Sequence, residues 1–376
     1  MENKNTWVEI NKAALSHNLK QFRKIIGPQV RLLIPVKANA YGHGLVEVAK
    51  IVLPNGADWL GVNSLEEAEF LCSNKIFKPI LILGYVKLTE LKRLKFFKNI
   101  RLAVYNEATV KKLGQLKSKV KIHLKLETGA TRQGVALKEI LVFVKLIKKY
   151  KNIELEGIYT HFANVEDTKN HHFAFSQLKK FNQAVELLEK NGIKIPLKHA
   201  ACSAAAILYK KTHFNLVRPG ISVYGLWSSY ETKVAAGKKH KSIKLELVLS
   251  WKSIIAQIKN VKQGSAVGYG RTEKVSRDSR IAVIPVGYWD GFDRGLSSVG
   301  NVLIKGKRTK VIGRICMNMF MVDVTDIKNV KTEDEVVLIG RQGREEITAD
   351  EIAEKLKTIN YEVVTRINPL IKRKII

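Results

Sequence analysis

Residues 31–38 read R-L-L-I-P-V-K-A, a run of apolar residues closed by a lysine, and runs of this kind predict the fold of the chain. Similar runs recur downstream with amphipathic stretches between them, at 58–63, 79–85, 101–105, 121–127, 155–161, 197–202 and 215–218. Near-continuous apolar runs are typical of parallel strands covered on both faces. Eight such strands, each followed by room for a helix, predict an α/β fold of the (β/α)8 TIM barrel type.

Helix signals lie between these runs. Ser64 and Glu67 have the spacing of a capping box, and the apolar positions of 178–188 step by three or four before a stop at Asn191-Gly192. A doubly wound open sheet is the alternative fold. It would carry a glycine-rich phosphate loop after its first strand, and residues 36–44 do not supply that fingerprint.

The pattern changes after Leu226. Residues 231–244 are polar and rich in lysine, which predicts a linker or an exposed loop. Short β-rich segments with turn signals follow, at 245–251, 280–286, 301–306, 320–324 and 335–340. Thr348 and Glu351 form a second capping box before one late helix. We therefore expect a barrel domain over 11–235 and a mainly antiparallel β domain over 236–376, joined by an N-terminal strand within 1–10.

The composition narrows the class of protein. Lys+Arg number 65 against 34 Asp+Glu, a formal net charge of +31, which indicates either a polyanionic partner or a general excess of lysine. Lysines are spread over almost every segment and no nucleic-acid-binding module accompanies them, so the second interpretation is favoured. The three cysteines, without a C-x-x-C pair, argue against disulfides and structural zinc. We expect a soluble cytoplasmic protein without a signal peptide or membrane span.

Polar residues at the carboxyl ends of barrel strands indicate an active site. In this chain those positions hold Lys37, Tyr41, Lys125, Arg132, His161, Ser203 and Arg218. Lys37 ends an apolar strand, and partial desolvation there favours the neutral amine that Schiff-base chemistry requires. The alternative is a surface lysine whose charged end reaches water. The pair His171-His172 lacks further ligands at useful spacing, so no metal site is predicted.

The stretch P-V-K-A-N-A-Y-G-H-G at 35–44 resembles the cofactor-lysine signature of the alanine racemase family. Seven further motifs follow in the family's order and approximate spacing: K-L-E-T-G-A-T-R-Q-G, T-H-F-A, R-P-G-I-S-V-Y-G, G-Y-G-R-T, V-G-Y-W-D-G, G-R-I-C-M and I-N-Y-E. The resemblance covers essentially the whole chain. It implies an isomerase that uses pyridoxal 5′-phosphate and interconverts L-alanine and D-alanine, supplying D-alanine for cell-wall peptidoglycan.

The resemblance also implies a role for each matching residue. Lys37 would hold the cofactor and act as one catalytic base, and Tyr269, from the other subunit of a homodimer, would be the second base in a two-base proton transfer. Supporting roles fall to His161, Arg218 and Lys125, the last at a position that is carbamylated in many members. The cofactor would contact Lys37, Tyr41, Arg132, Ser203, Arg218, Gly220, Ile221 and Tyr361. Arg132 and the backbone amide of Met317 would bind the substrate carboxylate.

Some positions depart from the family pattern. Cys202 stands where the family usually has asparagine, and the entrance residues are Tyr288, Trp289 and Asn318, of which Trp289 is unusually large and Asn318 replaces an aspartate. These differences leave open a racemase of broader specificity, for example one that accepts serine. A non-catalytic protein that binds pyridoxal phosphate or nucleic acid is the alternative from another functional class.

Overall fold

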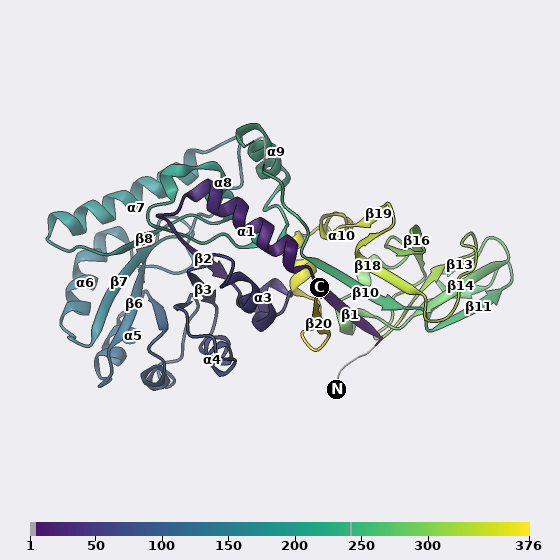
Figure 1. Cartoon of the computed structure of the whole chain (residues 1–376), viewed down its shortest axis with the longest axis horizontal. Helices are drawn as coiled ribbons and strands as arrows, with labels where there is room; N and C mark the ends of the chain where they lie inside the picture. The colour runs from purple at the N-terminus through teal and green to yellow at the C-terminus, as the bar shows by residue number, and fades with distance from the viewer. Residues whose placement is uncertain (1–4, 241–242) are drawn as a thin grey trace. The chain divides into compact units, whose positions relative to one another are not determined.

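In the computed structural model, which describes residues 5–240 and 243–376, the chain divides into two compact units. One unit comprises Ala14–Ala38 and Val48–Glu246. The other comprises Met1–Ala13, Asn39–Glu47 and Leu247–Ile376, within the described ranges. Figure 1 labels many of the helices and strands of both units.

The first unit is built on eight parallel strands in the order β8-β7-β6-β5-β4-β3-β2-β9. The strands are β2 (Arg31–Pro35), β3 (Trp59–Val62), β4 (Ile80–Ile82), β5 (Ile100–Val104), β6 (Val120–Lys125), β7 (Ile153–Tyr159), β8 (Leu197–His199) and β9 (Leu216–Val217). Because β9 pairs with β2 and also contacts β8, the sheet nearly closes. The predicted (β/α)8 barrel is therefore confirmed, and all eight strands fall within the predicted apolar runs or within two residues of them.

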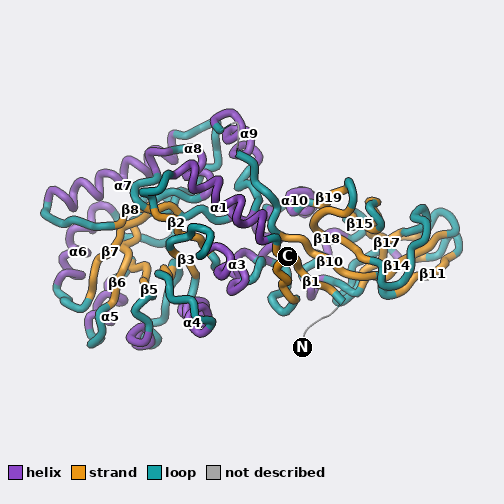
Figure 2. The backbone as a smooth tube through the Cα atoms, viewed as in Figure 1, coloured by secondary structure: helices purple, strands orange, loops and turns teal. Residues whose placement is uncertain are grey.

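Helices surround these strands (Figure 2). They are α1 (Lys12–Ile26), α3 (Leu45–Val52), α4 (Leu65–Ser73), α5 (Glu107–Gly114), α6 (Ile140–Lys148), α7 (His172–Lys190), α8 (Ser203–Leu208) and α9 (Tyr230–Lys239). The hydroxyl oxygen of Ser64 accepts from the backbone N–H of Glu67 at 3.2 Å, as the capping box predicts. Helix α7 ends at Lys190, directly before the predicted stop.

The prediction of a linker over 231–244 is wrong for most of that segment, because α9 occupies Tyr230–Lys239. Ser229 caps this helix by accepting from the N–H of Thr232 at 3.1 Å, and the side chains of Thr232 and Ala236 are fully buried. The cap at Ser229 and the buried Thr232 and Ala236 thus help to hold this lysine-rich segment in a helix. Residues 241–242 of the predicted linker lie outside the described residues.

The second unit is a largely antiparallel sheet in the order β11-β14-β17-β16-β15-β18-β10-β1-β20, with β19 paired to β18, which confirms the predicted second domain type. Its strands are β1 (Thr6–Ile10), β10 (Leu249–Ile254), β11 (Gln257–Val261), β12 (Ala266–Val267), β13 (Glu273–Lys274), β14 (Ser279–Ile284), β15 (Asn301–Ile304), β16 (Lys307–Ile312), β17 (Phe320–Asp323), β18 (Glu335–Gln342), β19 (Glu345–Ile347) and β20 (Lys372–Ile375). Strand β1 pairs antiparallel with β10 and parallel with β20. Helices α10 (Ala349–Leu356) and α11 (Asn360–Thr365) complete the unit.

Candidate active site

The short element α2 (Lys37–Tyr41) follows the first barrel strand, and its backbone is left-handed. Residues 38–41 all have φ between +52° and +54°, a region that costs a residue with a Cβ roughly 1–2 kcal/mol. The carboxylate of Glu67 holds the start of this turn by accepting from the N–H of Ala38 at 2.7 Å. A strained backbone of this kind persists only where the surrounding structure holds it in place, and such residues are frequent at active sites.

The far end of the turn is held within the second unit. The ring of Tyr41 lies 6.1 Å from the ring of Tyr361, so two residues predicted to share a cofactor contact do meet. The guanidinium of Arg373 donates to the carbonyl of Gly42 at 2.9 and 3.1 Å. A Cβ at Gly42 would lie 1.9 Å from the carbonyl oxygen of Val364, so only glycine allows this close approach of α11.

Four cationic side chains gather at the carboxyl ends of the barrel strands, and they account for much of the site's electrostatics. Burial lowers the pKa of Lys37, and the charge of Arg132 lowers it further, against the opposing effect of Glu67. Burial, Arg132 and Arg218 lower the pKa of Lys125 to about 8. Both amines therefore release a proton more readily than a surface lysine does.

His161 belongs to the same group of residues. Burial lowers its pKa to about 3, with further contributions from Arg218, Arg132, Lys125 and Lys37. Its imidazole is therefore neutral at physiological pH. Burial likewise lowers the pKa of Arg218 to about 10, which still leaves its guanidinium charged.

The loop after β6 is shaped by Glu127 and contains Arg132 of the predicted site, while Lys125 is the last residue of β6 itself. The Glu127 carboxylate accepts from the backbone N–H groups of Gly129 at 2.5 Å and of Arg132 at 3.3 Å. The amine of Lys125 donates to Oε1 of Gln133 at 3.0 Å. Sequence reasoning missed Gln133, although it directly follows Arg132 in the motif.

Arg218 is anchored by three hydrogen bonds. Its guanidinium bonds to Nδ1 of His199 at 2.6 Å and donates to the carbonyl oxygens of Thr160 at 2.7 Å and Ala200 at 3.2 Å. It also lies over the ring of Tyr159, 5.1 Å from the centroid, and that ring stacks on His199 at 4.8 Å. His199 and Tyr159 were not predicted as site residues. The one signal in the sequence that could have indicated them is a polar side chain within a strand whose other residues are apolar and buried.

Ser203 begins α8 and connects two barrel loops. Its Oγ accepts from the N–H of Gly220 at 2.9 Å and of Ser222 at 3.4 Å, which brings the predicted residues Ser203, Gly220 and Ile221 together. The hydroxyl of Ser222 is fully buried and has no hydrogen-bond partner among the described residues. Hydroxyls and backbone amides that converge in this way suit a phosphate group.

This end of the barrel unit therefore fits the cofactor that the motifs imply. Lys37, Lys125, Arg132 and Arg218 supply positive charge, and the nearby Glu127 and Glu67 carboxylates are bound to backbone N–H groups. Pyridoxal 5′-phosphate carries anionic phosphate and phenolate oxygens that this charge would stabilise. Lys37 would hold the cofactor, while Ser203 and the backbone amides at 220–222 would hold its phosphate.

The remaining predicted residues lie in the second unit. Tyr269 stands between Gly268 and Gly270, both with positive φ, and 70% of its side chain is exposed. The N–H of Trp289 donates to the carbonyl of Met317 at 3.0 Å, which places these two predicted residues side by side. A Cβ at Gly287 would lie 2.2 Å from that same carbonyl oxygen, so this close packing also depends on glycine. Tyr288, Trp289, Met317 and Asn318 are all exposed.

Family models and related sequences match nearly the whole chain, and all of them are described as alanine racemase. Family models for the N-terminal and C-terminal domains of alanine racemase match residues 10–228 and 248–375. The alanine racemase of Methanococcus maripaludis is 43% identical over 98% of this chain and 97% of its own length. That of Halothermothrix orenii is 40% identical over 98% of this chain and 96% of its own.

Solved structures agree with the sequence matches. The crystal structure of alanine racemase from Bacillus anthracis with bound L-Ala-P has a TM-score of 0.93 and 34% identity, covering 100% of this chain and 96% of that one. The alanine racemase of Clostridium difficile 630 in complex with cycloserine has a TM-score of 0.90 and 32% identity, covering 100% of this chain and 96% of that one.

Proposed function

The chain belongs to the alanine racemase family, and from that premise we propose that it interconverts L-alanine and D-alanine with pyridoxal 5′-phosphate as its cofactor. The observation that carries the proposal is the cluster of Lys37, Arg132 and Arg218 at the carboxyl ends of the barrel strands. When bound, pyridoxal 5′-phosphate withdraws electrons from the α-carbon of the amino acid, so that its proton becomes acidic.

The residues of this chain would transfer the proton and bind the carboxylate of the substrate. The lowered pKa of Lys37 gives a larger fraction of neutral amine, which can accept a proton from the α-carbon on one face. Tyr269 would return a proton on the opposite face. The guanidinium of Arg132 would bind the substrate carboxylate through its planar fork, assisted by the N–H of Met317.

Arg218 favours proton transfer over other chemistry on the same cofactor. Its guanidinium only donates hydrogen bonds, so a pyridine nitrogen in front of it would remain unprotonated. The electron withdrawal would then be weaker, which suits proton transfer at the α-carbon and does not favour decarboxylation. The neutral His161 and the anchored guanidinium together would keep this part of the site fixed.

We also propose that the active sites are shared within a homodimer. The exposure of Tyr269, Trp289 and Met317 (70%, 60% and 55%) supports this proposal, because exposed aromatic and methionine side chains are enriched at interfaces. Mixing inactive Lys37→Ala and Tyr269→Phe subunits should restore about one working site in each mixed dimer. No recovery after demonstrated subunit exchange would contradict a shared site.

The product and the location follow from the same proposal. D-alanine made by this enzyme would supply peptidoglycan synthesis. The three free cysteines suit a reducing compartment, and we propose the cytoplasm. Among the described residues, no helix has both the length and the apolar character needed to cross a membrane.

The function is tested with purified protein and L-alanine, with D-alanine measured by chiral chromatography. Tyr269→Phe should keep the absorbance of the bound cofactor and lose roughly 10²–10⁴-fold in rate. Tyr230→Phe, at another exposed tyrosine, is the matched control and should keep full activity. A Tyr269→Phe enzyme as active as wild type would refute the role of this phenol.

Two further assays separate the alternatives. Turnover of serine beside alanine decides whether the specificity is broader, a question raised by the exposed indole of Trp289 next to Met317. If neither amino acid is racemised while the cofactor absorbance is present, the chain is a binding protein. Nucleic-acid affinity that falls steeply with salt would favour the polyanion partner indicated by the net charge.

A further inference from the structure

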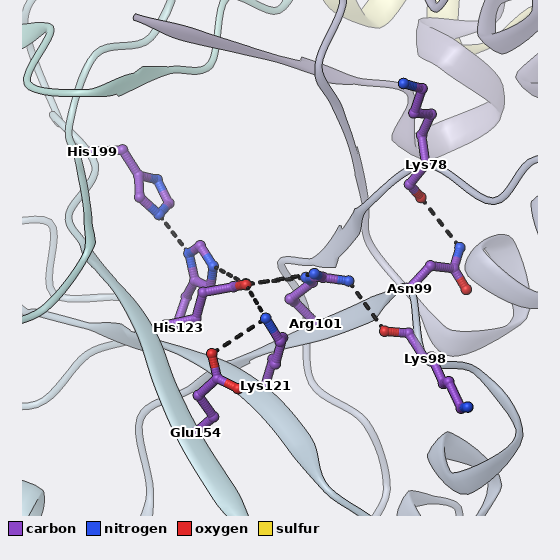
Figure 3. Close-up of polar contacts among 9 residues, drawn as sticks. Lys78, Lys98, Asn99, Arg101, Lys121, His123, Glu154 and His199 are labelled. Atoms are coloured by element: carbon purple, nitrogen blue, oxygen red, sulfur yellow. Dashed lines mark hydrogen bonds and ion pairs between the residues drawn. The ribbon is translucent and has the colours of Figure 1, made fainter.

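A line of buried polar groups runs from Arg218 into the interior of the barrel unit. His199, on β8, bonds to Arg218 through Nδ1 at 2.6 Å, and its Nε2 lies 2.8 Å from Nδ1 of His123 on β6. Nε2 of His123 lies 3.4 Å from the carboxylate of Glu156 on β7. Both imidazoles are fully buried. Figure 3 shows His199 and His123 facing each other, with Arg101 and Lys121 beyond them.

The direction of each hydrogen bond in this line is determined by its two ends. Arg218 can only donate, so its contact with His199 is a hydrogen bond when Nδ1 of His199 accepts, and the proton of a neutral ring is then on Nε2. That Nε2–H donates to Nδ1 of His123, whose proton is in turn on Nε2 and donates to Glu156. Any other arrangement of protons on two neutral rings places two donors or two acceptors against each other.

The ionisation of these groups agrees with that direction. Burial lowers the pKa of His123 and of His199, so both rings are neutral. Burial alone would raise the pKa of Glu156, but hydrogen bonds from His123, Lys121 and Arg101 bring it well below its ordinary value. Glu156 is therefore an anion that only accepts.

Glu156 is itself held firmly. Its carboxylate accepts from Nε of Arg101 at 3.0 Å and from the amine of Lys121 at 2.8 Å. Arg101 also lies over the ring of Trp59, 5.1 Å from the centroid. The residue after Glu156 is Gly157, where a Cβ would lie 2.4 Å from Nδ1 of His123. Glycine at 157 is thus the residue that leaves room for the imidazole.

We propose that Glu156 is a positioning residue for the reaction, acting through His123 and His199 to orient the guanidinium of Arg218. The carboxylate keeps the proton of each ring on Nε2, so Nδ1 of His199 stays an acceptor. With the opposite tautomers, an N–H of His199 would confront an N–H of Arg218 at 2.6 Å, and the guanidinium would be displaced. This inference rests on the proposed function, in which Arg218 faces the pyridine nitrogen.

The test compares Glu156→Met with Glu154→Met in the full-length enzyme. Glu154 is the matched control, because it lies two residues earlier on β7 and pairs with the same Lys121 at 3.2 Å, while 55% of its side chain is exposed. Histidine rings labelled with nitrogen-15 report which nitrogen carries the proton. Wild type and Glu154→Met should show His123 and His199 protonated on Nε2, and Glu156→Met should show a fraction of His199 protonated on Nδ1.

Kinetics give a second readout. Glu156→Met should lower kcat for alanine about tenfold with less than about a twofold change in KM, the effect of roughly one hydrogen bond. Glu156→Gln keeps an acceptor oxygen and should restore most of kcat. Unchanged ring tautomers in Glu156→Met, or an equal change in Glu154→Met, would overturn the proposal.

If Glu156→Met does not fold, Glu156→Gln decides. An amide accepts more weakly than a carboxylate, so the Nε2–H proton of His123 should move upfield relative to Glu154→Gln. No movement would overturn the proposal. The ring signals are recorded without alanine. A failure of the racemase function would appear as inactive wild-type enzyme and leave these signals as expected, so the two failures are distinguishable.

Discussion

The amine of Lys125 donates a 3.0 Å hydrogen bond to Oε1 of Gln133, and this bond holds it at the carboxyl end of β6. The same amine lies 5.7 Å from the centroid of the Tyr159 ring, whose buried hydroxyl has no hydrogen-bond partner among the described residues. Burial, Arg132 and Arg218 lower the pKa of Lys125 to about 8. Lys125 therefore combines a reactive amine with cationic neighbours that would stabilise an anion formed on it.

We predict that Lys125 takes up carbon dioxide as a carbamate. A bond forms between Nζ and the carbon, and one proton is released. Uptake should increase as the pH rises through about 8, because the neutral amine is the reactive form. Carbon-13 NMR with labelled bicarbonate should show a carbamate signal in wild type and in the exposed control Lys262→Ala, but not in Lys125→Ala. Absence of the signal at saturating bicarbonate would contradict this prediction.

Ser203→Ala should weaken both cofactor binding and folding. The substitution leaves the buried N–H of Gly220 without its acceptor, a cost of about 1–3 kcal/mol in the free energy of unfolding. Chemical denaturation and cofactor titration measure the two effects. Ser118→Ala is the control, because the Ser118 hydroxyl is also buried but has no partner among the described residues. Equal losses in the two variants would show that the hydrogen bonds of Ser203 contribute little.

Replacing alanine by glycine should affect the free energy of unfolding differently in the left-handed turn and in a right-handed helix. Ala38→Gly relieves a residue at φ +53°, so it should leave the free energy of unfolding unchanged or raise it by up to about 1 kcal/mol. Ala14→Gly, within the right-handed helix α1, should lower it by at least about 1 kcal/mol, because the buried methyl group of Ala14 is lost as well. Denaturant titration of both variants measures the difference. A similar loss in both would mean that the turn is not strained.

Acid should destabilise the protein through His161. Burial and the four neighbouring cations lower the pKa of His161 to about 3, while the unfolded chain titrates near 6.5. The unfolded state therefore binds more protons between these values, and stability falls as the pH drops from about 6.5 toward 3. Between pH 7 and pH 5, wild type should lose roughly 2 kcal/mol more than His161→Gln.

The control for this pH series is His172→Gln, at an exposed histidine of α7. It should follow wild type across the whole range. Denaturation midpoints and slopes at each pH give the free energies. A His161→Gln variant with the same pH dependence as wild type would show that this ring does not titrate as proposed.

Much of the fold could be predicted because its signals are local. The apolar run 31–38 contains the strand Arg31–Pro35, and the hydroxyl of Ser64 caps α4 within three residues. The prediction of a linker over 231–244 was wrong because it rested on the high lysine content of the segment. The N-cap at Ser229, which is also present in the sequence, indicates the helix that the structure contains. Lys37 was predicted from its position at the end of an apolar strand as well as from a motif, whereas Tyr269 was predicted from a motif alone, which carries no information on burial.

The sequence by itself determined the barrel, the second β-rich unit and the residues able to carry the chemistry, because strand periodicity, caps and motif order are properties of neighbouring residues. Only the tertiary structure decided that His123 and His199, separated by 76 positions, would meet at 2.8 Å and connect Arg218 with Glu156. It also decided the low pKa of His161, since burial and the charges of side chains from several strands exist only after the sheet has closed. Such contacts depend on which strands become neighbours, and no local pattern records that.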